Sequence, residues 1–293
     1  MQFTEIEYQV TSGVATVTLN RPNQLNAFTT TMVNEVLEVI DAVDRDDDVR
    51  ALILTGRGRA FSAGADLSAG ADTFDYDDPK SEGAIGSQRV ANVSAPRDGC
   101  GRITLRLFDC RKPIIAAVNG PAVGMGATML LASDIRVASE SARFGFVFTR
   151  RGIAPEGAST WFLPRVVGIS QAAEWLYTGR VFDAAEALAG GLVRSVHPDG
   201  DLLDAARALA AEIAEAAPVS VALTRQMLWR MLGADHPMDA HRADSRAIYA
   251  TGAGSDAREG IISFLEKRPP RFGGKVSTDL PDIFPDWQQP EYS

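Results

Sequence analysis

Two short glycine-containing segments have the residue types that bind an anionic or strongly polarised group through the main chain. The first, residues 61–67, reads Phe-Ser-Ala-Gly-Ala-Asp-Leu, and the second, residues 119–127, reads Asn-Gly-Pro-Ala-Val-Gly-Met-Gly-Ala. Glycine lets the backbone approach a ligand, and a helix that begins after Gly124 would direct its free N–H groups and the positive end of its dipole at an anion. Each segment alone is also typical of close packing between a strand and a helix.

Three familiar motifs do not fit these segments. A dinucleotide-binding fingerprint needs a third glycine after Gly124 and Gly126, but Ala, Thr and Met follow them. A phosphate-binding P-loop needs Gly-Lys-Ser or Gly-Lys-Thr, which the sequence lacks. Ser62 has Gly64 after it but Ala60 before it, so the sequence has no nucleophile elbow here.

Both segments belong to a chain that alternates predicted strands and helices. Residues 51–55 and 113–118 are short apolar runs typical of buried strands, and each precedes one glycine segment. Apolar residues between 30 and 43 recur at helical spacing, with Thr29 or Thr30 as the N-cap. The other predicted elements are strands at 8–10, 14–19 and 134–138 and a helix at 127–132. This alternation predicts an α/β fold.

Three regions depart from the alternation. Residues 69–101 are polar and rich in Gly, Pro and Asp, which is typical either of a lid over a site or of disorder. From about residue 200 the sequence turns to Ala-rich helix, and the last residues contain helix-breaking prolines and glycines. We therefore expect a core at 1–199 with a lid-like insertion, a helical region at 200–267 and an extended tail at 268–293.

The composition excludes several classes of protein. Of 293 residues, 45% are hydrophobic, and 29 Lys and Arg against 38 Asp and Glu give a net charge of −9, which argues against a nucleic-acid partner. No apolar run approaches the roughly 18 residues of a membrane span, and the first residues do not resemble a secretory signal. Two cysteines and three scattered histidines predict no disulfide framework and no metal site. We expect a cytoplasmic protein.

The two glycine segments belong to a longer series of motifs that resembles the crotonase superfamily, also called the enoyl-CoA hydratase/isomerase family. The resemblance runs from about residue 3 to 272, and seven segments match in order. They are Asn20-Arg21-Pro22 with Leu25-Asn26-Ala27, residues 61–67, residues 112–126, Ser133-Asp134-Ile135 with Phe144-Gly145, residues 176–180, residues 185–193 and residues 259–267.

The resemblance implies a crotonase-like ββα superhelix with a C-terminal helical region that builds homotrimers, often paired into hexamers. It implies an acyl-CoA thioester as ligand, with coenzyme A as part of the substrate and no prosthetic group. Two backbone N–H groups of the family hold the thioester oxygen, and by position these are the amides of Ala63 and Met125. An amide donor does not depend on its side chain, so methionine is competent at the second position.

The catalytic base is where the sequence departs from the family's hydratases. Their two glutamates are replaced by Thr128 and Phe148, neither of which is a carboxylate. The segment Pro155-Glu156-Gly157 resembles the Pro-Glu-Gly segment of peroxisomal-type Δ3,Δ2-enoyl-CoA isomerases, in which a single glutamate is the base. The alternative for Glu156 is a carboxylate in the first turn of a helix, where it would complement the dipole.

Coenzyme A should lie against the first glycine segment. By resemblance the residues on that side are Leu25, Ala27, Ala63, Gly64, Ala65, Asp66 and Leu67, and Phe264 and Lys267 match a segment that reaches a neighbouring subunit's nucleotide. An ammonium there would meet phosphate. The alternatives are a solvated helix end for Lys267 and Arg268 and a helix cap for Asp66.

The sequence therefore predicts an acyl-CoA enzyme that isomerises 3-enoyl-CoA to 2-enoyl-CoA, with Glu156 as its acid and base. A hydratase that adds water to 2-enoyl-CoA and a catalytically silent acyl-CoA binder are the alternatives. The sequence does not predict the acyl chain of the substrate, because the insertion 69–101 is expected at the edge of the acyl pocket and its fold cannot be predicted.

Overall fold

A six-stranded sheet forms the centre of the computed structural model, which describes residues 3–77, 85–288 and 290–293. Its strand order is β1-β2-β3-β4-β6-β9, with β1 and β2 antiparallel and the remaining neighbours parallel. The bounds are β1 Ile6–Thr11, β2 Val14–Leu19, β3 Ala51–Gly56, β4 Ile114–Val118, β6 Ile135–Ser139 and β9 Ser195–His197. A smaller sheet joins β5 Pro121–Val123, β7 Arg143–Gly145 and β8 Val181–Asp183.

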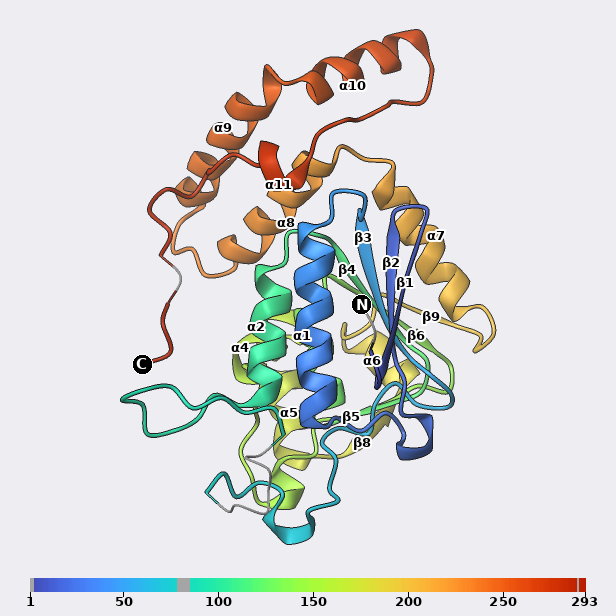
Figure 1. Cartoon of the computed structure of the whole chain (residues 1–293), viewed down its shortest axis with the longest axis vertical. Helices are drawn as coiled ribbons and strands as arrows, with labels where there is room; N and C mark the ends of the chain where they lie inside the picture. The colour runs from blue at the N-terminus through green and yellow to red at the C-terminus, as the bar shows by residue number, and fades with distance from the viewer. Residues whose placement is uncertain (1–2, 78–84, 289) are drawn as a thin grey trace.

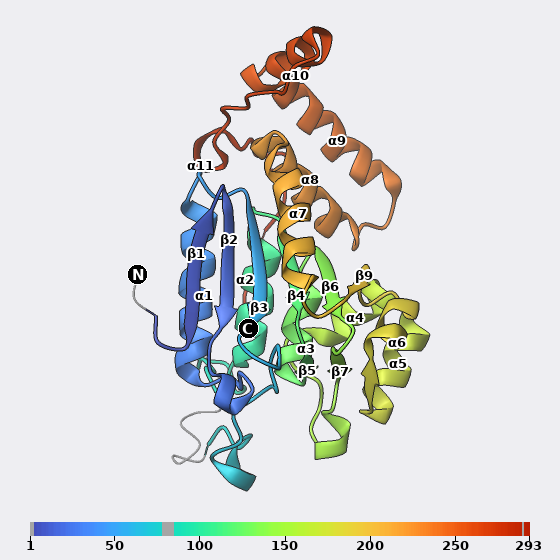
Figure 2. The same cartoon turned by 90° about the vertical axis from the view of Figure 1, so that its right-hand side faces the viewer.

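Helices cover both faces of the large sheet (Figures 1 and 2). α1 Thr30–Arg45 and α2 Gly99–Asp109 pack on one face, where their apolar side chains join the main core. α7 Leu202–Ala214 packs on the other face, through Leu202, Ala206 and Ala210. Because both faces are covered, β3 and β4 are continuous apolar runs, as the sequence predicted.

The helical region that the sequence predicted at 200–267 is not uniform. Its first helix, α7, belongs to the sheet layers, whereas α9 Pro237–Gly252 and α10 Ser255–Glu266 extend away from the sheet at one end of the molecule (Figures 1 and 2). The remaining α-helices are α3 Met125–Met129, α4 Ser159–Val167, α5 Ile169–Thr178, α6 Ala184–Ala189, α8 Pro218–Met231 and α11 Val276–Asp279. Short 3-10 turns lie at Pro22–Gln24, Gly70–Asp72, Leu130–Ala132 and Thr149–Arg151.

The chain after α10 returns to the body of the molecule. Ile283 packs with Val219 and Leu223 of α8, and the Tyr292 hydroxyl donates to the carbonyls of Ala95 and Pro96, each at 3.1 Å. The tail therefore meets the predicted insertion 69–101, whose last residues are already the first turn of α2. No helix in the described residues is long and apolar enough to cross a membrane.

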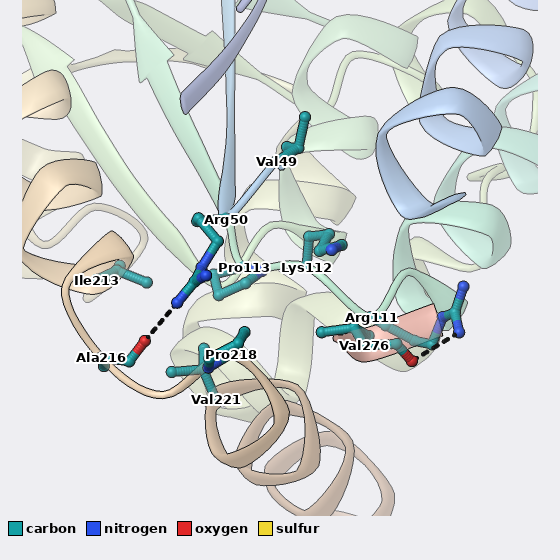
Figure 3. A pocket seen from close by; sticks show the side chains of 10 residues that line it. All are labelled: Val49, Arg50, Arg111, Lys112, Pro113, Ile213, Ala216, Pro218, Val221 and Val276. Atoms are coloured by element: carbon teal, nitrogen blue, oxygen red, sulfur yellow. Dashed lines mark hydrogen bonds between the residues drawn. The ribbon is translucent and has the colours of Figure 1, made fainter. Parts of the chain in front are cut away.

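A small basic pocket lies where α7, α8 and α11 meet the sheet (Figure 3). Arg50 donates to the Ala216 carbonyl at 2.9 Å and Arg111 to the Val276 carbonyl at 3.4 Å. Lys112 is 2% exposed, its ammonium has no hydrogen-bond partner among the described residues, and burial lowers its pKa. The hydrogen bonds of Arg50 and Arg111 connect the C-terminal helices to the sheet.

The buried Arg225 of α8 provides a test of how firmly α8 is held. Its guanidinium pairs with Asp134 at 2.8 Å and donates to the carbonyls of Leu107 and Phe108. Arg225→Met should lower the free energy of unfolding by about 3–5 kcal/mol, because it removes the cation that pairs with the Asp134 carboxylate and the donor of two main-chain carbonyls. Urea unfolding measures this loss.

The matched control is Arg242→Met, because the ion pair of Arg242 with Asp239 lies at the surface, where the two side chains are 64% and 43% exposed. Its expected effect is within about 0.5 kcal/mol. Equal losses for the two variants would contradict the role given to Arg225.

Candidate active site

The structure brings the two glycine segments together, backbone against backbone. The Ser62 N–H donates to the Pro121 carbonyl, and the Val123 N–H donates to the Ser62 carbonyl, both at 3.0 Å. A Cβ atom placed on Gly64 would lie 2.7 Å from the Val123 carbonyl oxygen and 3.5 Å from the Met125 nitrogen. Residue 64 therefore has no room for a side chain, and the Met125 amide lies directly beside it.

The second segment turns sharply into α3. Gly124 has φ 55° and ψ −125°, and its N–H donates to the Gly145 carbonyl at 2.8 Å. Met125 is the first residue of α3, as expected for a helix that begins after Gly124, and it lies two residues before the helix predicted at 127–132. Its N–H has no acceptor among the described residues, which is usual for the first turn of a helix.

The Ala63 amide is not available to a ligand, contrary to the sequence prediction. Its N–H donates to the Leu25 carbonyl at 2.9 Å. Two residues on, Ala65 lies opposite Phe28 in an isolated parallel bridge. The hydrogen bonds of this bridge run from the Phe28 N–H to the Gly64 carbonyl and from the Asp66 N–H to the Phe28 carbonyl. The Ala65 N–H has no acceptor within the described part of the chain, so Ala65 replaces Ala63 as the free amide of this segment.

Glu156 lies in the loop before α4, next to the helix that carries Met125. A Cβ on the following residue, Gly157, would lie 2.6 Å from Thr128 Cγ2 and 2.7 Å from Cys100 Sγ. The Cys100 thiol in turn lies 3.8 Å from the Met125 carbonyl oxygen. The structure therefore places the loop that carries Glu156, the predicted base, against α3 and α2.

The environment of Glu156 favours its protonated form. The residue is partly buried, and no hydrogen-bond donor to its carboxylate is present among the described residues. Burial, and secondly the nearby Asp98 carboxylate, raises its pKa to about 8. A carboxyl group with a pKa near neutrality can both accept and return a proton.

Thr128 and Phe148, which the resemblance aligns with the two glutamates of the family's hydratases, are both buried. Phe148 is 4% exposed and packs in the main core. Thr128 is fully buried, and its hydroxyl has no hydrogen-bond partner among the described residues. Cys100 is also buried, which raises the pKa of its thiol and keeps it neutral. Of these three side chains and Glu156, Glu156 is therefore the one with a carboxyl group, and the Asp98 carboxylate lies near it.

The residues predicted to bind coenzyme A fall into two groups. Leu25, Ala27 and residues 63–67 lie together around the first segment, where Asp66 pairs with Arg21 at 2.9 Å. Burial opposes ionisation of Asp66, but hydrogen bonds from Ser68 and Arg21 lower its pKa. Asp66 is not the cap of the next helical turn, whose N-cap is Ala69.

Phe264 and Lys267 form the second group and lie at the other end of the molecule, on and after α10 (Figures 1 and 2). Phe264 is 80% exposed, and Lys267 ends the helix in a left-handed conformation with φ 55°. The next residue, Arg268, pairs with Glu259 at 2.6 Å and Glu266 at 2.7 Å. Within one subunit these residues do not meet the glycine segments, so their contact with a neighbouring subunit's ligand stays a prediction.

Comparison with known proteins agrees with this architecture. The sequence model of the Enoyl-CoA hydratase/isomerase family matches residues 9–275. Enoyl-CoA hydratase ACTT3 of Alternaria alternata is 39% identical over 262 residues, which cover 89% of this chain and 83% of that protein. The 1,2-epoxyphenylacetyl-CoA isomerase of Escherichia coli K12 is 36% identical, over 91% of this chain and 97% of that protein.

Solved structures give the same result. The crystal structure of a putative enoyl-CoA hydratase from Streptomyces coelicolor A3(2) superimposes with a TM-score of 0.82 at 32% identity, over 94% of this chain and 96% of that chain. The mixed α/β fold with its C-terminal helices is therefore the crotonase fold that the sequence predicted. The chain belongs to the enoyl-CoA hydratase/isomerase family, within the crotonase superfamily.

Proposed function

We propose that this enzyme isomerises 3-enoyl-CoA to 2-enoyl-CoA, with Glu156 as its acid and base and the amides of Ala65 and Met125 as donors to the thioester oxygen. The observation that carries the proposal is the placement of the Glu156 loop against α3, the helix that begins at Met125, where burial raises the pKa of Glu156 to about 8. Thr128 and Phe148 leave the site without the two glutamates of a hydratase.

The proton transfers follow from this arrangement. Glu156 takes a proton from C2 of the substrate, and the electrons move through the carbonyl to give a dienolate. The two amides stabilise the negative oxygen, and each such donor is typically worth about 2.7–4 kcal/mol of barrier. Glu156 then returns the proton at C4, which moves the double bond to C2 without any second acid.

Hydration of 2-enoyl-CoA is the second candidate. Enoyl-CoA hydratase ACTT3, 39% identical to this chain, supports it, whereas the E. coli relative is named an isomerase. With Glu156 as its acid and base, the protein would activate water with one glutamate where the family's hydratases use two. This should make hydration slower than isomerisation.

Assays with both substrates test the proposal. We expect the unmodified protein to convert 3-enoyl-CoA, and Glu156→Gln to lose that conversion. Hydration of 2-enoyl-CoA that is lost in Glu156→Gln would instead establish the hydratase, and coenzyme A thioester binding without any turnover would establish a silent binder.

The pKa of Glu156 predicts the pH dependence of turnover. A base acts in its deprotonated form, so kcat/KM for 3-enoyl-CoA should rise tenfold per pH unit below about pH 8 and level off above it. Measurement of kcat/KM between pH 5.5 and 9.5 checks this prediction. A profile already level at pH 5.5 would show that Glu156 is not the titrating base.

We also propose that the C-terminal helices form homotrimers or hexamers. Large apolar side chains support this proposal, because Ile248, Tyr249, Phe264 and Leu265 are between 71% and 88% exposed on α9 and α10. The cytoplasmic location stays a prediction.

A further inference from the structure

We infer that Asp98 is a positioning residue for Glu156: it holds the loop of the base in place and supplies the negative charge that acts on it. This inference rests on the proposed function of Glu156. Asp98 precedes α2 as its N-cap residue. Its Oδ1 atom accepts the Gly101 N–H at 2.5 Å, which caps the helix, and the Gly157 N–H at 3.1 Å, which belongs to the residue after Glu156.

α2 holds both polar backbone groups of Gly157. Asp98 accepts from its N–H, and the buried Thr104 hydroxyl donates to its carbonyl at 3.0 Å. The backbone needs such restraint here, because Gly157 has φ 64° and Ala158 has φ 54°, a conformation that is unfavourable for alanine. The side chains of Asp98 and Thr104 thus hold the backbone directly after Glu156.

The charge on Asp98 is a separate effect. The ionisable groups that interact with Glu156 in the described residues are Asp98, Cys100 of α2 and Tyr76 of the insertion. Burial raises the pKa of the Cys100 thiol and raises the pKa of Tyr76 to about 12, so both are neutral near pH 7. Asp98, whose Oδ1 accepts two N–H groups at the start of α2, is the aspartate among these neighbours. Among these neighbours, Asp98 therefore supplies the formal charge.

Substitutions separate the two effects. Asp98→Asn retains a carbonyl oxygen that can accept from Gly101 and Gly157 but removes the charge. Thr104→Val removes the other attachment of Gly157 and retains the charge. Asp98→Ser is a second neutral variant, because serine is also a good N-cap residue.

The pH profile of kcat/KM distinguishes these variants. In Asp98→Asn the rise that the parent shows below about pH 8 should move to lower pH by about one unit, so that kcat/KM at pH 6 increases about tenfold. In Thr104→Val kcat should fall while the midpoint stays in place. An unchanged midpoint in both Asp98→Asn and Asp98→Ser would overturn the inference.

The pH dependence of the free energy of unfolding tests the inference without an activity assay. The pKa of Glu156 is raised in the folded state, from 4.5 to about 8, so its ionisation destabilises the fold and stability is lost as pH rises through this window. Urea unfolding between pH 5.5 and 8.5 should show this loss in the parent, little of it in Glu156→Gln, and a smaller loss in Asp98→Asn. Equal slopes for Asp98→Asn and the parent would overturn the inference.

The two proposals fail in different ways. If Glu156→Gln retains full turnover, the proposed function is wrong, but the unfolding slopes still report whether Asp98 acts on Glu156. If Glu156→Gln is inactive and Asp98→Asn leaves both the pH midpoint and the unfolding slope unchanged, only the inference about Asp98 is wrong.

Discussion

Glu156→Gln should lower kcat for 3-enoyl-CoA by about 10²–10⁴-fold, the usual contribution of a general acid or base. Glutamine has the shape of the protonated acid but cannot accept the proton from C2. The affinity for the coenzyme A thioester should change little, because the first glycine segment, which is proposed to bind the ligand, is unaltered. Steady-state kinetics together with calorimetric binding of a substrate analogue measure both quantities.

Glu212→Gln is the matched control, since Glu212 lies exposed on α7 and has the same side chain. It should retain full kcat. The role of Glu156 would be contradicted if Glu156→Gln also retained kcat. It would also be contradicted if kcat and ligand affinity fell only because Glu156→Gln was unfolded, as judged by circular dichroism.

Gly64→Ala should lower kcat by about 10²–10³-fold, which is the cost of one lost donor to the oxyanion. The new Cβ would lie 2.7 Å from the Val123 carbonyl oxygen, so the two segments must move apart and the Ala65 and Met125 amides lose their common geometry. Stability should fall as well, because Gly64 has φ 94°, where an L side chain is strained. Kinetics on protein shown to be folded separates the two effects.

Gly168→Ala provides the control for strain alone. Gly168 has φ 80° between α4 and α5, and a Cβ there meets nothing within 4 Å. It should lose stability but retain kcat. Full activity of Gly64→Ala, or an equal loss in Gly168→Ala, would contradict an oxyanion site between the glycine segments.

Local sequence patterns were sufficient to predict the main strands and helices that form the layers of this fold. The apolar runs at β3 and β4 and the helical spacing of α1 appear in the structure nearly at their predicted bounds. The start of α2 was not predicted, because Gly99 and Gly101 stand in its first turn and hide the cap at Asp98. The packing of α7 on the sheet depends on contacts with Ala51 and Ile53, which are far away in the sequence.

The choice of the free amide could not be predicted in the same way. Ala63 and Ala65 are both alanines beside Gly64, and what distinguishes them is a hydrogen bond from Ala63 to Leu25, about forty residues away. Glu156 was predicted from its Pro-Glu-Gly segment, but its raised pKa depends on its burial and secondly on the Asp98 carboxylate, which is far away in the sequence. Spacing identified the segments, and long-range contacts determine their chemistry.

A structure with a bound, unreactive 3-enoyl-CoA analogue tests the central claim most directly. We predict the thioester oxygen about 2.7–3.1 Å from the nitrogens of both Ala65 and Met125, and the Glu156 carboxylate within about 3–4 Å of C2. A thioester oxygen away from both amides, or a Glu156 carboxylate turned away from C2 and C4, would contradict the account.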